Sequence, residues 1–155
     1  MTDSLKNLKD LIDILELPMK ELGFSFTYNY DSISSGGSFT NGFFSDDKIK
    51  IGFIFRGDKF GSVNYETSYS NISHDMIIEF LDKSNEQKLN FYNGGNFGGI
   101  RNSKSQNIIK IGEAFLDDFS HFILPYIRSN SIDDINKMIK TQRKKWMIKK
   151  TEHNK

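Results

Sequence analysis

The chain has 155 residues, a formal charge of +1, 14% aromatic residues and no cysteine. This length fits one domain, residues 1–155, in which only the last residues, 150–155, are expected to fray, and the missing cysteine excludes disulfides, thiol catalysis and thiolate metal sites. The first 20 residues contain four acids and the apolar runs are short, so we expect neither a signal peptide nor a membrane span, and a cytoplasmic protein.

The N-terminal segment predicts an amphipathic helix. Apolar residues recur every three or four positions, at Leu5, Leu8, Leu11, Ile12, Leu15, Met19 and Leu22. Thr2 or Asp3 can cap the start of this helix, and Gly23 stands where a left-handed residue commonly ends one. Pro18 predicts a kink or the separation of the last turn.

The hydrophobic period then changes from 3.6 to 2, which predicts strands. Aromatic residues alternate with polar ones over 24–30, and a less regular strand follows over 38–44. The clearest alternation is at 48–56, where Ile51, Phe53 and Phe55 are expected to share a buried face, and Gly57-Asp58 provides a tight turn into a strand at 63–67. Consecutive strands with short turns predict an antiparallel meander with one solvated face.

The second half of the chain returns to helical spacing. Ser73 can cap a short helix with Ile77, Phe80 and Leu81 inward, residues 88–92 could add a fifth, edge strand, and 108–127 predicts a long helix. Ser131 then opens a last helix with Ile132, Ile135, Ile139 and Trp146 inward. The predicted fold is α+β: an N-terminal helix, a four- to five-stranded antiparallel meander sheet, and C-terminal helices packed on one face.

No pattern predicts catalysis, a cofactor or a metal. The glycine-rich segment 94–99 could cradle phosphate, but the GK[ST] ending of a P-loop is missing, which favours a connection. Glu113, Asp117 and His121 share one helical face, where a solvated ridge is a better interpretation than a metal site. His74 shows no ligand partner in the sequence, and no nucleophile stands in a recognisable motif. We therefore expect a protein that is not an enzyme.

The charge distribution points to a partner. Residues 1–136 carry 13 Lys/Arg and 19 Asp/Glu, a net of −6, and residues 137–155 carry eight and one, a net of +7. An acidic body suits a basic protein partner and accelerates association with it, although a generic solubilising surface is an open alternative. The candidate partner-binding residues are Asp46, Asp47, Asp58, Glu66, Asp117 and Asp118. We expect a monomer or weak dimer.

The basic C-terminal segment 137–150 supports a different function. Cations around an aromatic residue can bind nucleic acid, here through Lys140, Arg143, Lys144, Lys145 and Trp146. The alternative is a helix whose cations offset the negative end of its dipole and pair with the acidic body. The charge of that body argues against a broad phosphate-binding surface, so nucleic acid is the second choice.

The order of the segments also resembles a protein family. A helix ending in Glu21-Leu22-Gly23-Phe24, a meander containing the runs 48–53 and 63–66, and then helices look like small bacterial immunity proteins of polymorphic or contact-dependent toxin systems. This resemblance implies a stoichiometric binder that blocks a toxin domain, as in toxin–antitoxin pairs and contact-dependent growth inhibition. It rests on architecture, so it assigns no role to any single residue.

Overall fold

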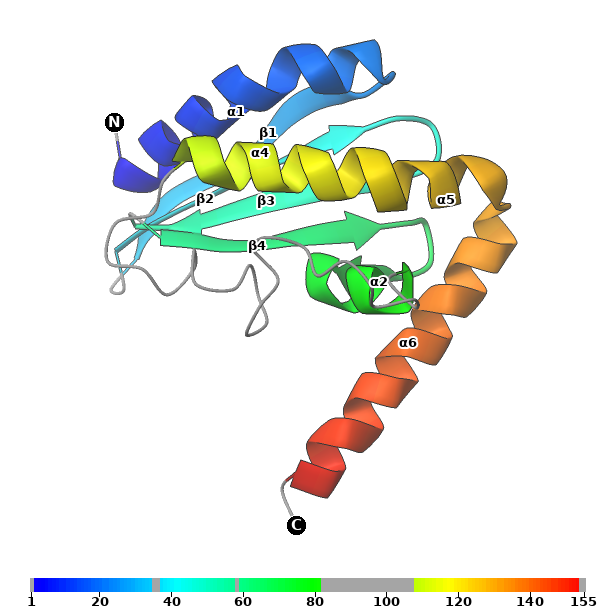
Figure 1. Ribbon diagram of the computed structural model, residues 1–155. Helices are drawn as coiled ribbons and strands as arrows, with labels where there is room; N and C mark the ends of the chain where they lie inside the picture. The colour runs from blue at the N-terminus through cyan, green and yellow to red at the C-terminus, as the bar shows by residue number, and fades with distance from the viewer. Residues whose placement is uncertain (1, 35–36, 58, 82–107, 154–155) are drawn as a thin grey trace.

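The computed structural model describes residues 2–34, 37–57, 59–81 and 108–153 (Figure 1). A five-stranded antiparallel sheet has its strands in chain order: β1 (Ser25–Ser34), β2 (Gly37–Ser45), β3 (Lys50–Arg56), β4 (Lys59–Glu66) and β5 (Asn71–Ser73). The helical elements are α1 (Asp3–Glu21), α2 (His74–Leu81), α4 (Ile108–Asp118), the π-helical turn η1 (Phe119–Ile123), α5 (Leu124–Ser129) and α6 (Ile132–His153). Helices α1 and α4 lie side by side over one face of the sheet. The predicted α+β fold is confirmed.

Strand β3 follows its predicted alternation throughout. Ile51, Phe53 and Phe55 are fully buried on the helix-covered face, whereas Lys50 and Arg56 are exposed. The Phe53 ring centroid lies 6.0 Å from that of Phe44 on β2 and 5.0 Å from that of Phe115 on α4. These edge-to-face contacts join the sheet to the helical layer.

Strand β1 departs from the predicted alternation. The register against β2 shifts between Tyr28 and Tyr30, which is the signature of a β-bulge. The extra residue changes the facing of the strand after the bulge, so the alternation predicted over 24–30 ends there. Tyr28, which precedes the bulge, is 48% exposed. The fifth strand is the short Asn71–Ser73, and the strand predicted at 88–92 lies outside the described residues.

Helix α1 has the predicted ends. The Thr2 hydroxyl accepts a hydrogen bond from the Leu5 amide at 3.2 Å, and Gly23 adopts a positive φ of 96°. The expectation that Pro18 splits off the last turn is wrong, because the helix continues to Glu21 and the Leu22 amide reaches the Pro18 carbonyl at 3.2 Å. Proline removes a donor, but its carbonyl still accepts.

The helix predicted over 108–127 contains a wider turn. At η1 the Leu124 amide donates to the Phe119 carbonyl, five residues back. Pro125 follows directly, and it can neither donate to the His121 carbonyl nor tolerate that carbonyl at the usual helical position. A π turn relieves this conflict and lets the chain continue into α5.

Helix α6 begins at the predicted cap, where the Ser131 hydroxyl accepts a hydrogen bond from the Asp134 amide at 3.1 Å. Ile135 and Ile139 are buried and Trp146 is half-buried. The C-terminal half of α6 extends beyond the two layers (Figure 1). The structure describes this helix as far as His153.

Candidate functional site

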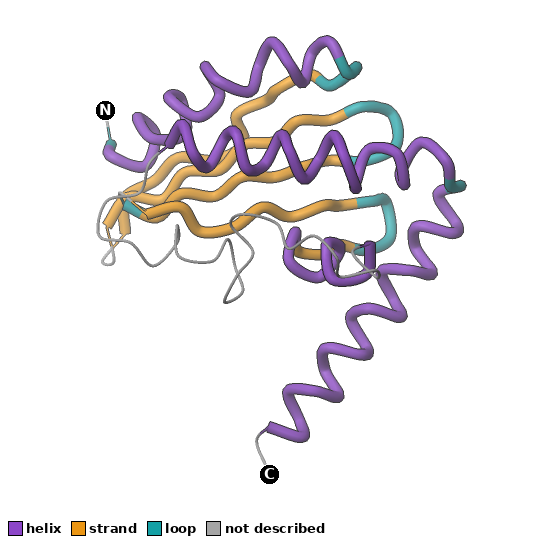
Figure 2. Tube along the Cα trace, viewed as in Figure 1, coloured by secondary structure: helices purple, strands orange, loops and turns teal. Residues whose placement is uncertain are grey.

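The connections between elements bring three of the six candidate acids together. The turn that carries Asp46 and Asp47 and the end of β4 that carries Glu66 lie at the same end of the molecule, where several loops gather (Figure 2). A depression of about 240 Å³ is lined by these three acids together with Lys48, Lys50, Ile49, Thr67 and Ser68. The sequence alone could not show this convergence, because it depends on the pairing of β3 with β4, which places Lys50 opposite Glu66.

Lys48 also lines this depression, but its ammonium is bound to the end of α5. Its ammonium donates hydrogen bonds to the carbonyls of Ile127, at 2.7 Å, and Asn130, at 2.8 Å, where it satisfies the C-terminal end of α5. The Asp46 carboxylate accepts from the amides of Lys48 and Ile49 at 2.8 and 2.9 Å, which fixes the turn. The Lys48 ammonium therefore binds the C-terminal end of α5. The Asp47 side chain is exposed.

The same contacts add two acids that our sequence analysis did not select. Asn130 leads into α6, whose first turn carries the exposed Asp133 and Asp134. The Thr67 hydroxyl donates to the Asn136 side chain at 2.6 Å, so both sheet turns contact residues at the start of α6. We call the group of five carboxylates the acidic end: Asp46, Asp47, Glu66, Asp133 and Asp134.

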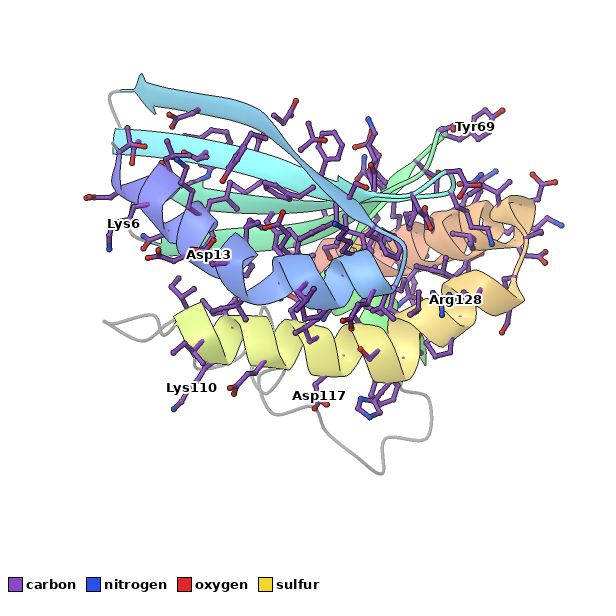
Figure 3. All side chains as sticks on the ribbon, turned by 90° about the horizontal axis from the view of Figure 1, so that it is seen from above. Lys6, Asp13, Tyr69, Lys110, Asp117 and Arg128 are labelled. Carbon is purple, nitrogen blue, oxygen red and sulfur yellow. The ribbon has the colours of Figure 1, made fainter. Side chains whose placement is uncertain are left out.

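The other candidate acids do not join the acidic end. Asp117 is exposed on α4, on the helix-covered side of the molecule (Figure 3). The prediction that Asp118 contacts a partner is wrong, because this residue is 1% exposed. Asp118 follows Phe115 by three residues and so lies on the apolar arc of the helix. This position in the sequence was a signal that its side chain is buried. Asp58 lies outside the described residues.

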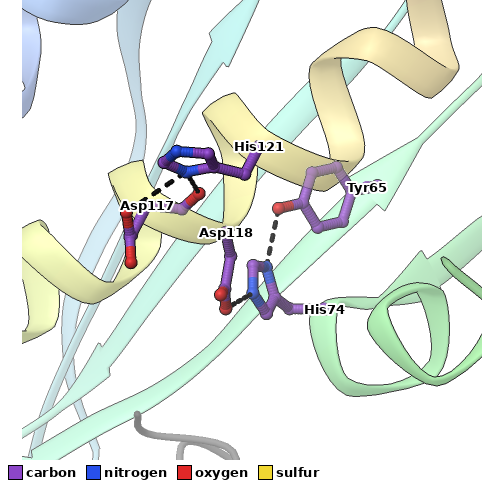
Figure 4. A network of polar contacts seen from close by, with 5 residues as sticks. All are labelled: Tyr65, His74, Asp117, Asp118 and His121. Atoms are coloured by element: carbon purple, nitrogen blue, oxygen red, sulfur yellow. Dashed lines mark hydrogen bonds and ion pairs between the residues drawn. The ribbon is translucent and has the colours of Figure 1, made fainter. Parts of the chain in front are cut away.

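Asp118 belongs to a buried polar network (Figure 4). The Tyr65 hydroxyl lies 2.7 Å from His74 Nδ1, and His74 Nε2 lies 2.8 Å from an Asp118 carboxylate oxygen. Burial lowers the pKa of His74 to about 3, although the nearby Asp75 opposes this shift. The imidazole is therefore neutral at pH 7: Tyr65 donates to Nδ1, and Nε2–H donates to Asp118.

This network gives His74 two hydrogen-bond partners, which the sequence did not indicate. All three side chains are at most 1% exposed, so a substrate cannot reach them in the folded chain. A buried carboxylate and imidazole are tolerated when they are hydrogen-bonded. Here the bonds join β4, α2 and α4, and the arrangement supports a role in holding the core together.

The predicted ridge, which runs from α4 into η1, is solvated. Glu113, Asp117 and His121 are all exposed, and His121 Nδ1 lies 3.2 Å from an Asp117 carboxylate oxygen. Across the part of the chain that the structure describes, no three His, Asp or Glu side chains gather as metal ligands would. The glycine-rich segment 94–99 lies outside that part.

Most of the candidate nucleic-acid contacts on α6 are engaged by the body of the protein. Arg143 donates to the Asn71 carbonyl at 2.9 Å and to its side chain at 2.8 Å. The Trp146 indole donates to Glu79, and the Lys145 ammonium lies 3.9 Å from the same carboxylate. Lys140 and Lys144 are the remaining two residues of that candidate set, and both are exposed.

Comparisons of this chain with protein-family models, with curated proteins and with solved structures find no match. Within the described residues, no helix has the length and apolar composition needed to cross a bilayer.

Proposed function

We propose that this protein is a non-catalytic binding module that recognises a basic surface of a partner protein through the acidic end. In this proposal it is a cytoplasmic immunity protein, which neutralises a bacterial toxin domain by tight stoichiometric binding. The observation that carries the proposal is the gathering of three carboxylates from two sheet turns around one depression, where Lys50 is the cation whose ammonium is not bound to the end of α5. The same turns contact the start of α6, which adds two exposed acids in its first turn.

The electrostatics of this cluster support protein recognition. Carboxylates on an exposed surface create a local negative field, which steers a basic partner into contact and rejects acidic ones. Nucleic acid, the second choice, has less support, because Trp146 is hydrogen-bonded to Glu79 and is not presented as a stacking platform.

The test begins with affinity purification of the tagged chain from the cells that produce it, and identification of the protein that is retained. The affinity of the purified pair is then measured with Asp47→Lys/Glu66→Lys in the acidic end and with Glu113→Lys/Asp117→Lys on α4. Both variants change the net charge equally. We expect the first to weaken binding by at least about tenfold and the second to have a much smaller effect.

The proposed neutralisation has its own measurement. Titration of the partner's toxic activity with this protein should reach its end point at one equivalent. Equal losses from the two charge reversals would place binding elsewhere on the acidic body, and a partner that retains its activity when saturated would contradict the immunity function.

A further inference from the structure

A second surface feature lies beside the acidic end. A groove of about 470 Å³ runs between the β4–β5 turn and α6, lined mainly by Tyr69, Asn136, Ile139, Lys140, Lys144 and Met147. The helical members recur at spacings of three and four residues, so they form one stripe along α6. Ile139 is fully buried and forms the floor, whereas the two lysines are exposed.

The groove exposes apolar side chains that a monomer would normally cover. Tyr69 is 82% exposed and Met147 is 69% exposed. Figure 3 shows Tyr69 projecting from the molecule on the side away from Asp117. Exposed apolar groups bordered by charges are typical of a protein–protein contact.

The acidic end and the groove are two halves of one face. They meet at the turn 67–70, which is closed by a 2.8 Å hydrogen bond from the Thr67 amide to the Ser70 carbonyl. Thr67 and Ser68 border the acidic depression, and Tyr69 and Ser70 line the groove. Carboxylates therefore outnumber cations on one side of the turn, and cations line the other side.

We propose that this face binds a second copy of the chain. A twofold axis near Tyr69 would lay the acidic end of each copy against the Lys140 and Lys144 side of the other, so both ionic contacts would form at once. A single acidic ligand in the groove would use only the positive half and would meet repulsion from the negative half. The dimer is weak and salt-sensitive, because its charges are at the surface.

The experiment is sedimentation equilibrium of the full chain at low and high salt. We expect a monomer–dimer equilibrium that weakens as salt rises. Asp47→Lys/Glu66→Lys and Lys140→Glu/Lys144→Glu should each weaken self-association by at least about tenfold. An equimolar mixture of these two variants should recover dimer, because the introduced lysines of one variant face the introduced glutamates of the other, and the second contact keeps its natural charges. Tyr69→Ser should also weaken it without a change of charge.

Glu113→Lys/Asp117→Lys on α4 is the matched control and should leave the dimer unchanged. A chain that is monomeric at every concentration in low salt, or two variants that fail to associate when mixed, would overturn the proposal. Binding of polyglutamate or of a single-stranded oligonucleotide by a strictly monomeric chain would overturn it in favour of those ligands. The Lys140→Glu/Lys144→Glu variant separates this proposal from the proposed function, because it should lose the dimer and retain the basic partner.

Discussion

At the scale of single residues, His74 is the side chain whose environment the sequence concealed most completely. Its partners are nine and 44 residues away, on β4 and α4, so no local pattern includes them. The position of Asp118 on the apolar arc of α4 was a signal that one buried carboxylate needs a partner. It did not identify which residue would supply the partner.

The lowered pKa of His74 predicts a loss of stability in acid. The unfolded chain has an imidazole pKa of about 6.5, whereas the folded value is about 3, so between these values the unfolded state binds the extra proton. The contribution of this group is complete above about pH 6.5 and declines as the pH falls below it, until the folded imidazole is also protonated.

Urea unfolding at several pH values checks this prediction with two variants. His74→Gln retains a donor and an acceptor but cannot be protonated, so its unfolding free energy should depend less on pH than that of the natural chain. His121→Gln, at an exposed position in η1, is the control for the loss of a histidine outside the network. Parallel profiles for the natural chain and His74→Gln would contradict the assignment.

At the scale of elements, prediction succeeded where one residue period continued without interruption. Strand β3 alternates from Lys50 to Arg56, and the structure follows it. Strand β1 starts with the same period, but its bulge depends on the pairing with β2, which the sequence of β1 alone does not specify. A proline in a helical pattern does not specify its structural effect. Helix α1 continues past Pro18, whereas a π-helical turn precedes Pro125.

The two faces of β3 predict different responses to substitution. Phe53→Ala should lower the unfolding free energy by about 3–5 kcal/mol, because it removes a fully buried ring between β2 and α4. Lys50→Ala should cost about 0.5–1 kcal/mol, since the ammonium lies 4.7 Å from the centroid of the Phe43 ring on the opposite face of the sheet. Urea titration of both variants measures the difference, and equal losses would show that the register is wrong.

At the scale of the whole molecule, the charge split was readable from the sequence, but the surface that it produces was not. Asp46, Asp47 and Glu66 were candidates from the charge pattern alone. Asp133 and Asp134 join them only because Lys48 binds the end of α5 and Thr67 binds Asn136. Tertiary contacts between distant turns thus decide which acids form a site, and a linear pattern cannot show them.

The charge split also predicts how association with the basic partner responds to salt and to truncation. The association rate should fall as salt rises, because the Debye length shrinks from about 30 Å at 0.01 M to about 10 Å at 0.1 M, while dissociation changes less. Deleting residues 143–155 removes six Lys/Arg and one Glu, so the remaining chain is more negative. Association should then be unchanged or faster.

The truncation is informative because the remaining part of α6 keeps its anchors. Ile135 and Ile139 stay buried, and Gln142 still donates to the Met76 carbonyl at 3.0 Å. The deletion also removes Lys144 and Met147, so a self-associated chain would release its acidic end for the partner. Stopped-flow measurement of the association rate of the full and truncated chains with the partner tests this prediction. Circular dichroism checks that the truncated chain is folded. A folded truncated chain that no longer binds the partner would assign recognition to the cationic helix, because the acidic end would be intact and still insufficient.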